Sequence, residues 1–219
     1  MIFSDEIIKW YHKNKRDLPW RNTTNPYKIW ISEIILQQTK VSQGLPYYIS
    51  FIEEFPTITD LANASEERVL KVWQGLGYYS RARNLHFTAK IIRDDYHSQF
   101  PKEYKLIREL RGVGDYTAAA ISSFCYNLPY AVLDGNVSRV LSRYFAIDTP
   151  IDSSTGKKIL KELSQKLLNI ESPAIYNQAI MEFGALICTP KKTDCSICPL
   201  SNSCKAFGTE LIELLPIKS

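Results

Sequence analysis

The chain of 219 residues contains no apolar run that approaches the 18–20 or so residues of a transmembrane helix. Its first residues lack the basic and apolar regions of a signal peptide, and no run of alternating residues predicts a β-strand. Internal repeats and low-complexity segments are also lacking. We therefore expect an all-α protein of the cytoplasm, with no membrane partner.

An excess of one charge is lacking too, since 27 Lys and Arg face 23 Asp and Glu and leave a net charge of +4. That surplus is compatible with a DNA-binding face but does not demand one. The five cysteines are an odd number, and four of them lie near the C-terminus. In a reducing compartment such a group indicates metal or cluster ligation more often than disulfides. The fifth, Cys125, is predicted to be a small buried apolar residue.

The four C-terminal cysteines follow the spacing Cys188-x6-Cys195-x2-Cys198-x5-Cys204. Four thiolates in so short a segment can hold one [4Fe–4S] cluster. A zinc ion on the same four cysteines is the alternative, although zinc sites more often use two pairs with short gaps. The spacing favours the iron–sulfur cluster and leaves zinc open.

Two glycines, Gly112 and Gly114, predict a tight turn between two helical segments. Peptide N–H groups in such a turn, together with those that begin the following helix, can bind a phosphate group. A single carboxylate, Asp134, follows downstream, just before Asn136 and a new helix. The pattern suggests chemistry on nucleic acid. The alternative is an ordinary corner between helices with an N-capping aspartate.

Glu33 lies in a helix predicted to start after Pro26, with isoleucines on both sides of it in the sequence. A carboxyl group in apolar surroundings has a raised pKa and can keep its proton near neutral pH, as a general acid must. The alternative is a carboxylate on the single solvated stripe of a mostly buried helix. Further along, the segment 75–81 contains two glycines, two tyrosines and Arg81, which predicts either a nucleic-acid contact or a helix end with core tyrosines.

Taken together, Leu110-x-Gly112-Val-Gly114, the downstream Asp134 and the four-cysteine segment resemble the helix–hairpin–helix DNA glycosylase superfamily of endonuclease III and MutY. The resemblance extends from about Leu18 to Phe207. Three segments are similar to the MutY branch, which acts on adenine: Leu18-Pro19-Trp20-Arg21 followed by Pro26-Tyr27, Ser32 to Thr39, and Tyr176 to Met181.

The resemblance implies a helix–hairpin–helix DNA glycosylase fold with an active site in the cleft between two domains. Residues 18–129 would form a six-helix domain, and residues 130–207 an iron–sulfur cluster domain that the N-terminal helix, residues 1–17, joins. Residues 208–219 look like the start of a linker. Most of the branch continues into a domain that recognises 8-oxoguanine, so we expect a weaker preference for 8-oxoguanine over guanine here.

The resemblance also implies a monofunctional glycosylase of base excision repair, which removes adenine opposite 8-oxoguanine or guanine from double-stranded DNA. It would act as a monomer, associated with the nucleoid if bacterial. Glu33 would protonate adenine and activate water, and an ionised Asp134, positioned by Asn136, would stabilise the sugar cation. Tyr116 stands where the endonuclease III branch has the lysine that permits strand cleavage, and tyrosine cannot form that Schiff base.

The binding residues implied by the resemblance fall into three groups, and the four cysteines would hold the cluster. Trp20, Arg21 and Gln178 would line the adenine pocket; Leu36, Gln38, Thr39, Leu76 and Tyr78 would contact the vacated site and the opposing base; Gly112 and Gly114 would contact phosphate. Two alternatives stay open: a thymine glycosylase for T·G mismatches, and a catalytically silent iron–sulfur protein that binds DNA.

Overall fold

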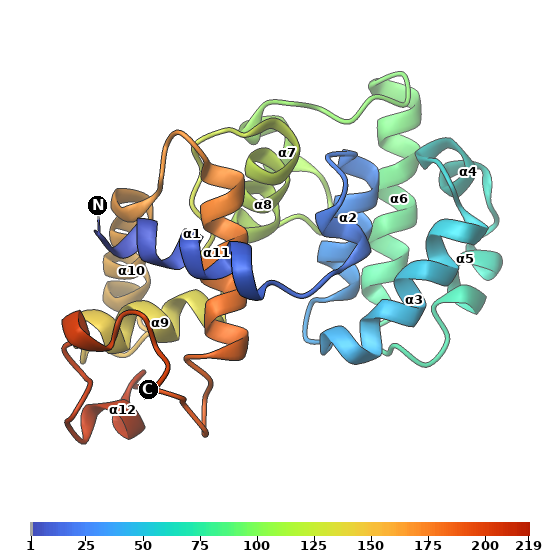
Figure 1. The fold of residues 1–219 in the computed structure, drawn as a ribbon. Coiled ribbons are helices and arrows are strands. Elements are labelled where there is room, and N and C mark those ends of the chain that lie inside the picture. The colour runs from blue at the N-terminus through green and yellow to red at the C-terminus, as the bar shows by residue number, and fades with distance from the viewer. Residues whose placement is uncertain (1) are drawn as a thin grey trace. The chain divides into compact units, whose positions relative to one another are not determined.

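The computed structural model describes residues 2–219, which form twelve α-helices and two short 3₁₀ helices (Figure 1). Within this range there is no β-strand, so the all-α prediction is confirmed. None of the helices is long and apolar enough to span a membrane. The helices are α1 Ile2–Asn14, α2 Pro26–Ile35, α3 Val41–Glu54, α4 Ile58–Asn63, α5 Glu66–Val72, α6 Ser80–Asp95, α7 Tyr104–Glu109, α8 Asp115–Tyr126, α9 Gly135–Phe145, α10 Ser154–Leu167, α11 Pro173–Leu186 and α12 Leu211–Leu214.

The chain divides into two compact units. The middle unit comprises residues 18–126 and contains α2 to α8. The terminal unit comprises residues 127–219 together with the N-terminal segment up to residue 17, of which residue 1 lies outside the described range. The chain leaves the terminal unit after α1 and returns to it before α9.

Helix α2 forms the centre of the middle unit, where it packs against α3, α6 and α8. It begins at Pro26, whose ring suits the first helical position, and the Asn25 side chain accepts hydrogen bonds from two N–H groups of the first turn. Eight of its ten residues are buried, among them Trp30, which is fully enclosed. A helix that is apolar on nearly all sides can be satisfied only in such a central place.

The predicted tight turn lies between α7 and α8. Gly112 has a φ of 82°, and a Cβ added there would come within 3.0 Å of the Asn84 Cβ. A side chain is therefore disfavoured both by the backbone conformation and by the neighbouring helix. The Thr88 hydroxyl of α6 donates to the Arg111 carbonyl at 2.9 Å and holds the turn against the unit.

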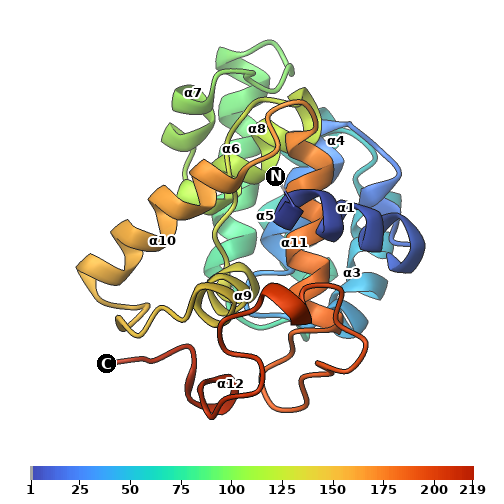
Figure 2. The same cartoon turned by 60° about the vertical axis from the view of Figure 1, so that its left-hand side comes forward.

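In the terminal unit, α11 lies between α1 and α9, and α10 packs against α9 (Figures 1 and 2). The Trp10 ring of α1 meets the Phe183 ring of α11 edge-on at 5.2 Å. Beside it, the Arg16 guanidinium makes two hydrogen bonds, at 2.9 and 2.6 Å, to the fully buried Glu182 carboxylate. This charged pair and the aromatic contact attach the N-terminal helix to α11 across more than 160 residues of sequence.

Candidate active site and cysteine cavity

Glu33 lies on the buried side of α2, and only 7 % of its surface is exposed. Burial raises the pKa of the neighbouring Cys125 thiol on α8, and the nearby charge of Glu33 raises it further. Glu33 therefore faces the α2–α8 contact rather than the solvated stripe. Cys125 itself is partly exposed.

The other predicted residues of the middle unit differ in their exposure. Trp20 is buried, with its ring edge-on to Tyr48 at 5.1 Å, and burial raises the pKa of Tyr48 to about 12. Leu76 is also buried, so its side chain lies in the core rather than on the surface. Arg21, Leu36, Thr39 and Tyr116 are half-buried, whereas Gln38, Tyr78, Gly112 and Gly114 are exposed.

Asp134 is the N-cap of α9, as the N-capping alternative predicted. One carboxylate oxygen accepts from the Val137 N–H at 2.7 Å, and the other accepts from the Asn136 amide at 2.8 Å. Withdrawal from water raises the pKa of Asp134, while these donors and the Arg139 charge act to lower it. The Val137 N–H, the Asn136 amide and the Arg139 charge therefore favour the ionised form of Asp134.

The segment that leads into Asp134 is held by α11. The Asn177 amide, which is fully buried, accepts from the Val132 N–H at 3.1 Å and donates to the Tyr130 carbonyl at 2.8 Å. The next residue, Gln178, is half-buried, and its carboxamide oxygen accepts from the Tyr11 hydroxyl of α1 at 2.7 Å. Asn177 thus fixes the segment before Asp134, and Tyr11 orients the adjacent Gln178 side chain.

A buried arginine joins Asn136 to the first cysteine. Arg139 donates to the Asn136 side-chain oxygen at 2.9 Å, to the Gly184 carbonyl at 2.7 Å and to the Cys188 carbonyl at 2.7 Å. Hydrogen bonds therefore run without interruption from the Asp134 carboxylate to the backbone of Cys188.

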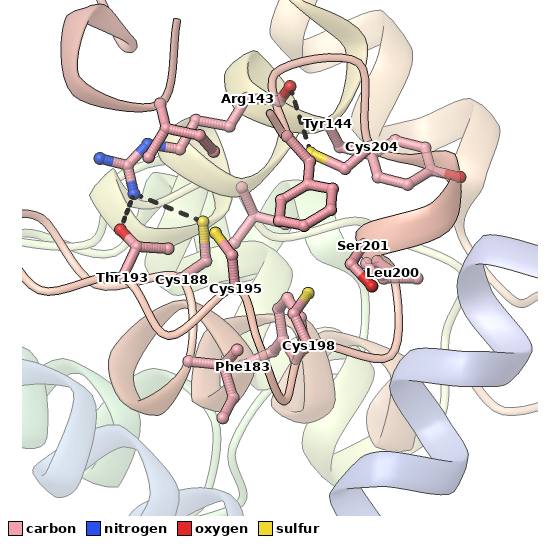
Figure 3. A pocket seen from close by; sticks show the side chains of 14 residues that line it. Arg143, Tyr144, Phe183, Cys188, Thr193, Cys195, Cys198, Leu200, Ser201 and Cys204 are labelled. Atoms are coloured by element: carbon pink, nitrogen blue, oxygen red, sulfur yellow. Dashed lines mark hydrogen bonds between the residues drawn. The ribbon is translucent and has the colours of Figure 1, made fainter. Parts of the chain in front are cut away.

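The four C-terminal cysteines line one cavity, as Figure 3 shows. About 380 Å³ of the space there is not filled by protein atoms, part of it open to solvent. The rest of the lining is mainly apolar, with Phe183, Ile187 and Leu200 among its members. Within residues 2–219, no three His, Cys, Asp or Glu side chains converge as the ligands of one metal ion would.

Arg143, on α9, makes hydrogen bonds to the segment that carries the cysteines. Its guanidinium donates to the Thr193 hydroxyl at 2.8 Å, to the Thr189 carbonyl at 2.7 Å and to the Cys188 sulfur at 3.6 Å (Figure 3). It also donates to the carbonyl of Leu215 in the C-terminal segment at 2.9 Å. Burial raises the pKa of the Cys188 thiol, and Arg143 lowers it. Arg143 therefore places a positive charge where thiolates would gather.

Residues 31–168 match the HhH-GPD superfamily base excision DNA repair protein family. The chain belongs to this superfamily. The predicted family and the helix–hairpin–helix fold are thereby confirmed.

Among curated members of the superfamily, the chain is 43 % identical to the adenine DNA glycosylase of Buchnera aphidicola from Baizongia pistaciae, over 94 % of this chain and 59 % of the relative. It is 40 % identical to the human adenine DNA glycosylase, over 93 % of this chain and 39 % of the relative. The chain thus spans about three fifths or less of the length of these two relatives.

Two solved structures resemble nearly the full length of the chain. A thermostable thymine-DNA glycosylase has a TM-score of 0.86 at 30 % identity and covers 94 % of this chain and 95 % of its own. A non-covalent endonuclease III–DNA complex has a TM-score of 0.78 at 23 % identity, with 93 % and 92 % covered, which supports the fold alone.

Two residues that organise this HhH-GPD chain were given no role from the sequence: Arg143 and Asn177. Each is a polar residue in a helix, and its spacing from glycines or cysteines carries no signal. Arg143 reaches an oxygen 72 positions away, and Asn177 reaches one 47 positions away. Such pairs become visible only when the helices are packed.

Gly184 offers a direct test of the Asp134 surroundings. A Cβ added at Gly184 would lie 2.7 Å from the Asn136 Cβ and 3.1 Å from its carbonyl oxygen. We expect Gly184→Ala to cost about 1–3 kcal/mol of stability because α9 and α11 must separate. The activity proposed below should fall by about 10- to 100-fold because Asn136 moves relative to Asp134.

Gly135→Ala is the matched control for stability, because a Cβ there meets nothing within 4 Å. Urea unfolding measures both variants. Equal free energies of unfolding for the two would show that the approach of α9 to α11 does not require glycine.

Proposed function

We propose that the chain is a monofunctional DNA glycosylase that removes adenine paired with 8-oxoguanine or guanine by hydrolysis of the N-glycosidic bond. The observation that carries the proposal is the different setting of two carboxyl groups. Glu33 is buried on an apolar helix, and Asp134 is half-buried with a hydrogen-bond donor on each oxygen. Curated relatives named adenine DNA glycosylase, at up to 43 % identity, support adenine as the base.

The chemistry follows from these settings. A base within a duplex must leave the stack before an enzyme can reach it. Glu33, in its protonated form, donates a proton to adenine N7 and makes the base a better leaving group. As the C1′–N9 bond breaks, positive charge develops on the sugar, and the Asp134 carboxylate stabilises it. Glu33, now ionised, accepts a proton from the attacking water.

Recognition of the base falls to Trp20, Arg21 and Gln178 in this proposal. A carboxamide has both a donor and an acceptor, which matches the edge of adenine. The hydrogen bond from the Tyr11 hydroxyl limits which end of the Gln178 carboxamide is presented. Tyr116 cannot form a Schiff base with the sugar, so the strand should remain intact after excision.

An excision assay on four duplexes tests the function: A·8-oxoguanine, A·G, T·G and U·G. We expect adenine release from the first two, with strand breaks only after heat or alkali. Thymine release from T·G would instead support the second candidate, which the 30 % identical thymine-DNA glycosylase structure favours. Binding without release of any base would support a silent DNA-binding protein.

We also propose that Cys188, Cys195, Cys198 and Cys204 hold a [4Fe–4S] cluster. The proposal is supported by the four thiols that line one mainly apolar cavity and by Arg143, which donates to one of the sulfurs. When bound, the cluster would supply a cross-link that orders the segment 188–204. Anaerobically purified protein should contain about four iron atoms per chain. Stoichiometric zinc in place of iron would contradict the assignment.

We propose that the protein binds double-stranded DNA as a monomer, has no membrane partner, and works in the cytoplasm, at the nucleoid if it is bacterial. The curated relatives named adenine DNA glycosylase support DNA as the partner. Light scattering during gel filtration, with and without duplex, measures the number of chains in the complex.

The raised pKa of Asp134 predicts the acid side of the pH profile. Its ionised form is needed, so the excision rate should fall as pH decreases through a pKa that lies above the ordinary value of 3.8. Asn136→Ala removes a donor that favours the ionised form, and the acid limb should then move to higher pH. Single-turnover rates measured against pH show the midpoint, and an unmoved limb would contradict the assigned role of Asn136.

A further inference from the structure

The Arg81 guanidinium lies between two turns of the middle unit. One nitrogen, Nη1, donates to the carbonyls of Ile34, Ile35 and Gln37 at 3.0, 2.9 and 2.6 Å. The other, Nη2, is 3.4 Å from the carbonyls of Leu76 and Gly77. A single side chain therefore contacts the end of α2 and the turn between α5 and α6.

Both turns contain a residue in the left-handed backbone region. Gln38, beyond the end of α2, has a φ of 56°, and Tyr78, before α6, has a φ of 46°. Residues other than glycine adopt this backbone region at a cost in free energy. Such conformations persist where the surrounding structure imposes them. Both side chains are exposed, Tyr78 to 64 %. The two strained backbone conformations therefore occur at residues whose side chains are exposed to solvent.

Arg81 supplies the constraint on both turns. Its charged group donates to carbonyls at the C-terminus of α2, where a cation is favoured. Its guanidinium carbon lies 5.6 Å from the centre of the Tyr78 ring and 5.3 Å from that of Trp73. Arg81 thus contacts the carbonyl oxygens of both turns, the Thr39 hydroxyl and two aromatic rings.

We propose that Arg81 is a positioning residue that makes the Gln38 and Tyr78 turns bind DNA as one unit. This inference rests on the proposed function, which assigns both turns to the DNA. Ile34, whose carbonyl Arg81 contacts, directly follows Glu33. Contact between DNA and either turn is thereby transmitted to the end of the helix that carries Glu33.

The test is a double-mutant cycle read by binding. The ligand is a duplex in which a tetrahydrofuran abasic-site analogue stands opposite guanine, and fluorescence anisotropy gives Kd. We expect Gln38→Ala and Tyr78→Ala each to weaken binding by about tenfold, with the double variant little worse than the weaker single variant. Additive losses would overturn the proposal. These exposed positions leave the core intact, so the result does not depend on a variant that fails to fold.

Arg81→Lys provides the second arm. Lysine keeps the charge but is a point donor that cannot reach both turns as the planar guanidinium does. We expect it to weaken binding by about tenfold in the wild-type background and less than about twofold when Tyr78 is alanine. An equal loss in both backgrounds would overturn the proposal, as would an equal loss on an undamaged duplex of the same sequence. Because binding is the readout, absence of base excision would refute the proposed function and leave this result independent.

Discussion

Replacing Glu33 with glutamine should lower the single-turnover rate of adenine excision by about 10²–10⁴-fold, the range expected for loss of a general acid and base. Glutamine has nearly the same shape, so the buried site on α2 should keep its packing. It can neither deliver a proton to adenine N7 nor accept one from water. Binding to the A·G duplex should change little, because the lost interaction belongs to the bond-breaking step.

Glu67→Gln is the matched control, since it makes the same chemical change on the exposed face of α5. Its excision rate should equal that of the wild type. Quenched-flow or gel-based single-turnover assays on A·G and A·8-oxoguanine duplexes measure both variants. Near-normal excision by Glu33→Gln would contradict the proposed mechanism, because that mechanism requires Glu33 to donate a proton to adenine and to accept one from water.

Replacing Arg143 with methionine should destabilise the terminal unit by about 3–5 kcal/mol, because each buried oxygen left without a donor costs about 1–3 kcal/mol. Arg143 is 3 % exposed, and its guanidinium donates to three backbone carbonyls, of Thr189, Pro190 and Leu215. Methionine fills much of the same volume but offers no donor. The segment that carries the cysteines should lose its anchor, and iron content should fall with stability.

Arg68→Met is the control for this change. Arg68 lies at the surface with 61 % of its side chain exposed and pairs with Glu54, so its loss should cost less than about 1 kcal/mol. Urea unfolding and iron analysis of the two variants decide the matter. Equal stability and equal iron content would show that the cysteine segment is ordered without Arg143.

Several features of this protein are determined by sequence alone, because the residues that specify them are close together in the chain. Gly112 and Gly114 predict the tight turn, since the φ of 82° at Gly112 is a property of one residue and its neighbours. The N-cap role of Asp134 is likewise local, since its partners are two and three residues away. The spacing of four cysteines within seventeen residues predicts a shared site for the same reason.

The tertiary structure decided which polar side chains hold those local features. Asn177 fixes the segment before Asp134, Arg143 fixes the cysteine segment, and Arg81 reaches carbonyls more than forty positions away at the end of α2. It also buried Trp20 and Leu76, whose sequence neighbours include exposed residues. Buried carbonyl and N–H groups must find partners, but which side chain reaches them depends on how helices distant in sequence pack together. That arrangement leaves no periodic or spaced pattern in the chain itself.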